Sequence, residues 1–402
     1  MKRDFLSSIE FLPEHRNSHK RKKKLTLDHL LDDYRQVEKL TASSFDLVMG
    51  AYRWAHIFEK EAADFLGEKT LKPKELRDLW QSAFSALMRR ENPPQGVIVA
   101  EAVEAAKSRF GKHVGGITNA FLRESTRRKK KILENLEKEP REILGRKIQE
   151  HWEKLDAELI DGIALKMIER EESGVNYFNQ KGELHHASWA EFKEASQPKQ
   201  VINPSSWAFI QWLCQELEKK SLQPESVLDA CAAPGSKSIA LSCQKQFLNS
   251  NFYLTDLKFP RLKRLKENLS NWVEHLPESQ EHYTRLVDWR NPEELPEKWP
   301  QEFDFIICDL PCSGSGTIPN RPDLNLSYPS PLSELIQSQK DILEQCWRKA
   351  KKTNSCLVAS ICSVDPLEIE AISKFFGTAP QFQSQNVNSD CREIITAWIR
   401  FV

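Results

Sequence analysis

The sequence predicts two domains of different fold class: an all-helical N-terminal domain, then an α/β domain with a mostly parallel sheet. Up to about residue 145, apolar residues recur at helical spacing, whereas after residue 200 short apolar runs alternate with helical patterns. The chain has 402 residues, about twice the length of a typical domain. Its neutral charge is unevenly divided, because residues 1–150 carry 31 basic and 23 acidic side chains and residues 151–402 carry 27 and 35. Halves of opposite net charge indicate that the two parts of the chain have different functions.

The N-terminal half is predicted to be helical because apolar residues fall on one face of each segment. Residues 1–24 are basic and are predicted to form a flexible tail. A second basic cluster lies at 127–131. We expect this cluster and residues 20–24 to contact nucleic-acid phosphates, with solvated surface charge as the alternative. The helical patterns cover 27–34, 45–52, 76–87, 99–110 and 117–123.

The remaining chain changes from a mixed pattern to regular strand–helix alternation, which predicts helices on both faces of a sheet. Ligands bind such sheets at the carboxyl ends of the strands. The mixed part has a predicted helix near 147–172 and a strand pair over 175–184. The later predicted strands are 226–229, 252–256, 303–309, 356–361 and 394–402, and the helices are 205–220, 236–246, 260–275, 331–352 and 366–376. The predicted domains are a tail (1–24), a helical domain (25–145), a mixed linking subdomain (146–200) and an α/β domain (201–402).

The cysteines and the absence of long apolar runs predict a cytoplasmic protein. No secretory signal pattern and no run of about 18 apolar residues occurs, so no membrane segment is expected. All nine cysteines lie in the second half, without regular spacing, which argues against a disulfide framework. No Cys/His pattern has zinc spacing, so no metal site is expected.

A loop of small residues follows the predicted strand 226–229, with the sequence LDACAAPGSKS. Gly235 allows a ligand close to the backbone, and the next helix offers free N–H donors. The loop is neither a Walker A motif nor G-x-G-x-x-G. Two acidic residues follow: Asp256 is placed to accept hydrogen bonds from ribose hydroxyls, and Asp288 to meet an adenine amino group. A tight turn, a helix cap and a loop aspartate are the alternatives for these three features.

A carboxylate and two thiols mark two further strand ends. Asp309 lies three residues before Cys312, and Cys362 follows the strand predicted over 356–361. Adjacent parallel strands would bring these three groups to one edge of the sheet. A buried small hydrophobe is the alternative for either thiol alone.

These motifs resemble a known family. The runs DACAAPGSK, DLPCSGSGTIPNRPDL and ICS are similar to the RNA 5-methylcytosine methyltransferases of the Sun/Nop2 type, which use S-adenosylmethionine. The runs LTASSFDLVMGAYRW, VIVAEAVEAAKSRFGK and GGITNAFLR resemble the NusB-like RNA-binding domain that precedes the catalytic domain in bacterial 16S rRNA (cytosine-5) methyltransferases of the B type. The resemblance covers about residues 25–402. It implies an all-α NusB-like domain followed by an α/β Rossmann-like methyltransferase domain.

The resemblance also implies a role for each motif residue. Cys362 would be the nucleophile that adds to carbon 6 of an extruded cytosine, and Cys312 would assist product release. Asp309 would touch both the cofactor region and the base, Asp256 would hold the ribose and Asp288 the adenine. No metal is required. The methionine end of S-adenosylmethionine would lie in the loop formed by Cys231, Ala232, Ala233, Pro234, Gly235, Ser236 and Lys237.

The resemblance implies RNA as the partner, most readily 16S rRNA. We also expect a monomer that has no membrane contact. Methylation of tRNA or of another site is one alternative. A second is a NusB-like RNA-binding or ribosome-assembly protein with weakened catalysis, although such a protein would not need Asp309 and both thiols. Several positions depart from the family pattern and leave the target cytosine open: Ser236, Asn320, Asn325, Ile361 and Ile369.

Overall fold

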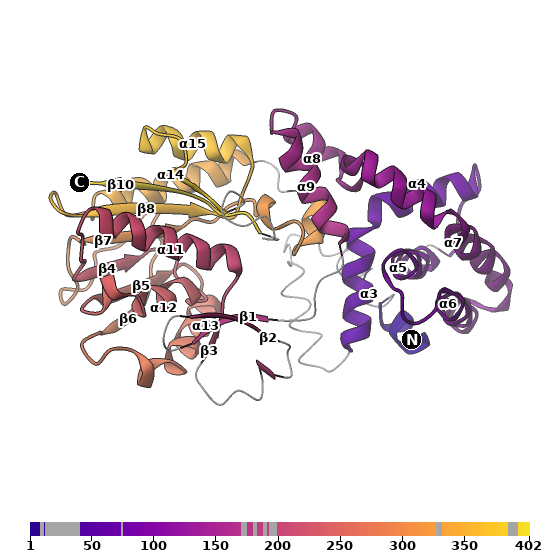
Figure 1. The fold of residues 1–402 in the computed structure, drawn as a ribbon, viewed down its shortest axis with the longest axis horizontal. Coiled ribbons are helices and arrows are strands. Elements are labelled where there is room, and N and C mark those ends of the chain that lie inside the picture. The colour runs from indigo at the N-terminus through magenta and orange to yellow at the C-terminus, as the bar shows by residue number, and fades with distance from the viewer. Residues whose placement is uncertain are drawn as a thin grey trace. The chain divides into compact units, whose positions relative to one another are not determined.

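The computed structural model divides the chain into two compact units (Figure 1). The helical unit comprises Met1–Arg170 and Ile318–Tyr328, and the sheet unit comprises Glu171–Thr317 and Pro329–Val402. The structure describes residues 1–8, 12, 41–73, 75–169, 175–179, 183–187, 191–192, 199–326, 328, 332–384 and 393–402. The helix predicted over 27–34, the basic residues 20–24 and most of the predicted tail lie outside these ranges. Residues 2–8 of that tail are helical, and Phe5 is buried.

The predicted helical fold of the N-terminal half is confirmed, with three main differences. The segment Ala55–Leu66 is a helix that the sequence patterns did not predict. The helix predicted over 117–123 continues to Lys138, because apolar Ile132 and Leu136 extend its buried face beyond the basic cluster. The helix predicted near 147–172 is two helices. The helices are α3 (Ala42–Arg53), α4 (Ala55–Leu66), α5 (Leu76–Arg89), α6 (Gln95–Phe110), α7 (Gly115–Lys138), α8 (Arg146–His151) and α9 (Ala157–Ile168).

Aromatic side chains from α4, α5 and α7 form the centre of the helical unit. The ring of Trp80 stacks on Phe121 with 4.3 Å between centroids. The Trp80 indole N–H donates to the Thr118 hydroxyl at 3.0 Å, so the polar atom is satisfied inside the core. Burial of each such ring stabilises the fold by about 1.5–3 kcal/mol.

The sheet unit contains a seven-stranded sheet within the described residues. Its order is β6-β5-β4-β7-β8-β10-β9, and the pairs from β6 to β8 are all parallel. The last two strands run antiparallel, so the mostly parallel prediction is confirmed. The strands are β4 (Ser226–Asp229), β5 (Asn251–Asp256), β6 (His282–Leu286), β7 (Phe305–Asp309), β8 (Cys356–Ile361), β9 (Phe382–Gln383) and β10 (Thr396–Phe401). A small antiparallel sheet of order β2-β1-β3 is formed by β1 (Val175–Asn179), β2 (Leu184–Ala187) and β3 (Lys199–Val201).

Helices cover both faces of the large sheet (Figure 1). One face packs against α11 (Pro204–Lys219), α12 (Ser236–Ser242) and α13 (Phe259–Ser270), and the other against α14 (Leu332–Trp347) and α15 (Pro366–Phe376). Every residue of β4 and β8 is buried, which explains their nearly continuous apolar sequence. Among the described residues, no helix is long and apolar enough to span a bilayer.

Candidate active site

The predicted site residues meet at the carboxyl ends of the parallel strands. Asp229, Asp256 and Asp309 are the last residues of β4, β5 and β7. Asp309 lies beside Ser360 in the register of β7 and β8, and Cys362 follows β8 directly. The parallel sheet therefore brings residues that are far apart in the sequence to one edge.

The loop after β4 is shaped by a buried carboxyl group and a glycine. Asp229 accepts hydrogen bonds from the Cys231 backbone N–H at 3.2 Å and from the Ser238 hydroxyl. Burial raises the pKa of Asp229 to about 7. Gly235 has a φ of 103° and precedes α12, and a Cβ there would lie 2.4 Å from the Leu265 side chain. The loop conformation therefore requires glycine at this position.

Asp256 retains an unused acceptor. Its side chain is 3% exposed, and one carboxylate oxygen accepts the Lys258 N–H at 3.0 Å. The other oxygen is buried without a hydrogen-bond partner, and the Arg261 guanidinium lies 3.5 Å away. A buried acceptor without a donor is unfavourable, so this atom fits a ligand hydroxyl.

Asp288 lies at the rim of a hollow of about 200 Å³ that also includes Leu257 and Leu286. Both leucines are exposed, at 49% and 43%, and would offer apolar contact to an aromatic base. The Asp288 carboxylate binds Arg290 through Nε at 2.8 Å, and this contact lowers the pKa of Asp288. Asp288 therefore lines the hollow, and its carboxylate is already bound by Arg290.

Asp309 is fixed by two donors. The Lys237 ammonium donates to one oxygen at 2.8 Å, and the Ser360 hydroxyl donates to the other at 2.8 Å. Burial alone would lower the pKa of Lys237, but the adjacent Asp309 carboxylate raises it above its ordinary value. The ion pair joins the loop after β4 to the end of β7.

The two predicted thiols are in contact. The Sγ atoms of Cys312 and Cys362 lie 3.3 Å apart, and both side chains are half-buried. The hydrogen bond with Cys312, followed by burial, raises the pKa of Cys362. Gly316 lies in the loop after β7, which carries Cys312, and its N–H donates to the Cys362 carbonyl at 3.1 Å. A Cβ at Gly316 would lie 2.6 Å from the Ile394 carbonyl.

Sequence reasoning missed three groups at this site. Ser360 holds Asp309, and Glu393 interacts electrostatically with Lys237 and Asp309 while burial raises its pKa. Glu368 is fully buried and hydrogen-bonds both thiol loops. Only Glu368 had a recognisable signal, because it falls at helical spacing with the buried Ala371 and Ile372.

Two of the departures from the family pattern, Asn325 and Ile361, are buried, and a third, Ile369, is partly buried. The Asn325 side chain accepts the Gly145 N–H at 2.7 Å and donates to the Ile143 carbonyl at 2.9 Å, within the helical unit. Ile361 is fully buried, and Ile369 packs against the apolar core. These three positions therefore contact the interior of their own units.

Each half of the chain matches the model of a known protein family. Residues 217–396 match the family model of the 16S rRNA methyltransferase RsmB/F, and residues 4–127 match that of the NusB family. Ribosomal RNA small subunit methyltransferase B of Photorhabdus laumondii is 35% identical over 175 residues, which cover 42% of this chain and 38% of that protein. The protein of the same name from Vibrio vulnificus is 31% identical over 196 residues, covering 44% and 40%. The chain thus matches less than half the length of these relatives.

The crystal structure of PH0851 has the same fold, with a TM-score of 0.66 over 99% of this chain and 98% of that one at 16% identity. The likeness includes both units, which confirms the predicted succession of an all-helical domain and a Rossmann-like α/β domain. The chain therefore combines a segment that matches the NusB family model with a segment that matches the RsmB/F methyltransferase family model.

Proposed function

We propose that this protein methylates carbon 5 of a cytosine in 16S rRNA, with S-adenosylmethionine as the methyl donor. The observation that carries the proposal is the contact between Cys312 and Cys362, at the sheet edge that also holds Asp309. Carbon 5 of cytosine is a poor nucleophile until a thiolate adds to carbon 6. A second thiol beside the first suits a reaction in which a covalent adduct must also be released.

In the proposed reaction, Cys362 is the nucleophile. Its sulfur bonds to carbon 6, and this makes carbon 5 electron-rich. After methylation, Cys312 assists removal of the proton from carbon 5, so that the bond to Cys362 breaks and the ring recovers its double bond. Asp309, oriented by Lys237 and Ser360, hydrogen-bonds the base near N3 and N4. A proton shared between Asp309 and the base there neutralises the negative charge that addition of the thiolate places on the ring.

The cofactor would lie along the ends of β4, β5 and β6. The loop from Cys231 to Lys237 would hold its methionine end, and the hollow at Asp288 would take the adenine. The Asp256 oxygen that has no hydrogen-bond donor would accept a ribose hydroxyl. S-adenosylmethionine supplies an electrophilic methyl group on a sulfonium.

The experiment uses unmodified 16S rRNA, tRNA and S-adenosylmethionine with a labelled methyl group, followed by bisulfite mapping of 5-methylcytosine. Label at one 16S cytosine supports the proposal, and label in tRNA favours the alternative substrate. RNA binding without any transfer would contradict the enzymatic function and favour an RNA-binding assembly factor.

The proposed RNA contact lies on one face of α7. Within the basic cluster 127–131, Arg128 pairs with Glu61 at 3.0 Å and Lys129 donates to the Leu87 carbonyl at 2.8 Å, so both are engaged with the protein. Arg127 and Lys130 are 74% and 90% exposed, and their ion pairs with Glu124 at 3.0 Å and Glu134 at 3.8 Å lie on the surface of α7 itself. The structure thus supports phosphate binding by only part of the predicted cluster.

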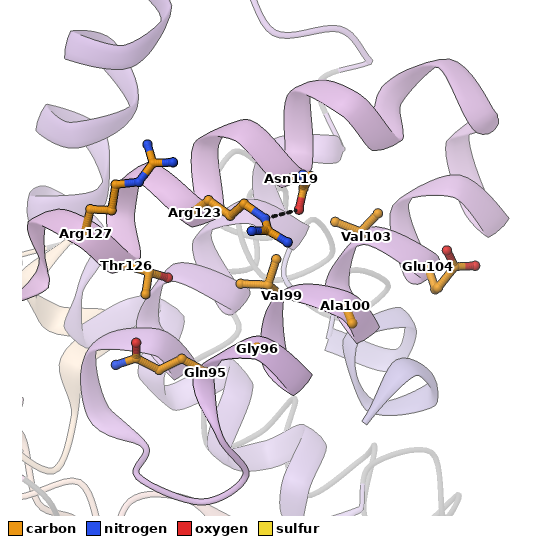
Figure 2. A pocket seen from close by; sticks show the side chains of 10 residues that line it. All are labelled: Gln95, Gly96, Val99, Ala100, Val103, Glu104, Asn119, Arg123, Thr126 and Arg127. Carbon is orange, nitrogen blue, oxygen red and sulfur yellow. Dashed lines mark hydrogen bonds between the residues drawn. The ribbon is translucent and has the colours of Figure 1, made fainter.

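Arg123 extends this exposed face toward an open hollow of about 470 Å³ between α6 and α7 (Figure 2). Figure 2 shows Arg123 and Arg127 beside the hollow, with Gln95 and Gly96 at the start of α6 on the other side. Guanidinium groups bind phosphate oxygens in bidentate fashion, so this surface suits an RNA backbone.

The RNA contact is tested by removing Arg123 and Arg127 together. We expect R123A/R127A to weaken rRNA binding and to reduce the slope of log K against log salt by about 2. The matched control R146A/K154A removes two exposed charges elsewhere in the helical unit, where Arg146 is 93% exposed. Equal loss of RNA affinity in both variants would contradict a localised phosphate site.

A further inference from the structure

We propose that Glu368 positions the two thiols, by binding the loop of Cys312 and the loop of Cys362 at once. The consequence for methylation rests on the proposed function, whereas the positioning of the thiols does not. Glu368 lies in the first turn of α15 and touches neither sulfur in a hydrogen bond. It is therefore a positioning residue and does not take part in the bond-making steps.

Each oxygen of Glu368 holds one thiol loop. Oε1 accepts the backbone N–H of Ser313, the residue after Cys312, at 3.0 Å. Oε2 accepts the hydroxyl of Ser363, the residue after Cys362, at 2.6 Å. One rigid carboxyl group thus fixes the two positions that immediately follow the thiols.

A third contact ties this bridge to a separate helix. The Gln339 side-chain amide of α14 donates to Glu368 Oε1 at 2.7 Å and to the Pro311 carbonyl, just before Cys312, at 2.9 Å. The Cys312 loop is therefore held on both sides of its thiol, through Pro311 and Ser313. Because α14 and α15 pack on the same face of the sheet, the anchor is part of the core.

Serine hydroxyls extend the connection. Ser363 Oγ lies 3.0 Å from Ser313 Oγ and 2.8 Å from Ser315 Oγ, and it accepts the Asp365 N–H at 3.0 Å. Ser315 Oγ in turn accepts the Val364 N–H at 2.9 Å. The two loops share a continuous polar network whose centre is Glu368.

The burial of Glu368 indicates a specific role. The side chain has no exposed surface, and within the described ranges no Lys, Arg or His forms an ion pair with it. Burial of such a group is costly unless its acceptors are used, and here three donors use them. A core that needed only packing would place an apolar residue at this position of α15.

The test measures, without RNA, how fast the two thiols form a disulfide, because this rate depends on how the thiols are held relative to each other. Diamide oxidises neighbouring thiols: the two sulfurs form a disulfide and their hydrogens pass to the azo bond of the reagent. We follow the Cys312–Cys362 disulfide by mass spectrometry. We expect E368A to form it at least about tenfold more slowly than the wild type, because three buried donors lose their acceptor.

Two further variants separate positioning from stability. E368Q keeps one acceptor oxygen and can donate to Ser363, so its disulfide should form within about threefold of the wild-type rate. S363A removes the hydroxyl that links Glu368 to the Cys362 loop, together with its contacts to Ser313, Ser315 and the Asp365 N–H. It leaves the Ser313 N–H and Gln339 on Glu368, so it should slow the reaction less than E368A does. If E368A does not fold, the S363A measurement carries the test.

The matched control is Glu370, which lies two positions away on α15, is 60% exposed and pairs with Lys374. E370A should match the wild type. The affinity for S-adenosylmethionine should stay constant across all folded variants, and kcat should fall with the disulfide rate. A wild-type disulfide rate in both E368A and S363A would overturn the proposal. If E368A and S363A slow disulfide formation as expected but the wild type methylates no RNA, the result would contradict the proposed function and leave the positioning role intact.

Discussion

The Sγ atoms of Cys312 and Cys362 lie 3.3 Å apart, although 50 positions separate the two residues in the sequence. The contact arises because β7 and β8 are adjacent and parallel, so that the loops after them leave the same edge of the sheet. Either sulfur alone would be an ordinary half-buried thiol. In the proposed reaction, one sulfur holds the base while the other acts on the adduct.

Removing each thiol should therefore have opposite effects on a covalent RNA complex. We expect Cys312→Ala to accumulate a protein–RNA adduct that survives denaturing electrophoresis, because release is blocked after Cys362 has added. Cys362→Ala should give neither adduct nor methylation. The double variant serves as the control and should give no adduct. An adduct in Cys362→Ala would show that another residue is the nucleophile.

The contact between the thiols should also control the reactivity of Cys362 as the pH changes. Hydrogen bonding to Cys312, followed by burial, raises the pKa of Cys362 above its ordinary value of 9.0. Because only the thiolate is alkylated, the rate for the wild type should keep rising above pH 9. In Cys312→Ala the main cause of the shift is gone, so the rate should level off at a lower pH. Mass spectrometry of the Cys362 peptide after iodoacetamide treatment measures this. Coincident pH profiles for the two proteins would argue against the coupling.

Buried strands and well-capped helices were predictable from the sequence. The bounds of β4, β8 and α15 agree with the predictions, since apolar runs end at polar residues and Asp365 caps the helix that Pro366 begins. The edge strand β6 was missed because His282–Leu286 is half-exposed and lacks an apolar pattern. The helix α4 was missed because only Trp54 separates it from α3.

The candidate site likewise has a part that the sequence predicts and a part that it does not. Motif residues at strand ends were predictable, because a parallel sheet fixes where those ends meet. The contacts among them were not, since the partners of Asp309 and of the thiol loops come from distant segments. The position of Asn325 gave no signal at all: it lies in the range predicted for the α/β domain, but it packs within the helical unit.

Asn325 should therefore matter for stability. Asn325→Ala leaves the buried Gly145 N–H and Ile143 carbonyl without partners, and we expect a loss of about 2–4 kcal/mol from the helical unit. Leu326→Ala, at a 39% exposed neighbour, should change stability by less than about 0.5 kcal/mol. Urea unfolding of the full chain measures both. Similar losses of stability in the two variants would show that the Asn325 hydrogen bonds do not stabilise the helical unit.

A deletion of residues 1–145 would remove Gly145 and Ile143, the two partners of Asn325. Charge substitutions on α7 are therefore a cleaner test of RNA binding than this deletion.

Asp229 should make the protein less stable as the pH rises. Burial raises the pKa of Asp229 from 3.8 to about 7, so between these values the folded state keeps a proton that the unfolded state has lost. The contribution of Asp229 to the free energy of unfolding is therefore fully present below pH 3.8. It falls by up to about 4 kcal/mol as the pH rises to about 7. Asp229→Asn cannot ionise, but it can still accept from Cys231 and meet the Ser238 hydroxyl. The variant should therefore exceed the wild type in stability at pH 8 by about 2–4 kcal/mol, with a smaller difference near pH 5. Urea unfolding at both pH values gives this difference, and contributions from other titrating groups cancel in the comparison. A difference that does not change with pH would mean that Asp229 is ionised in the folded protein, held by the donors of its loop.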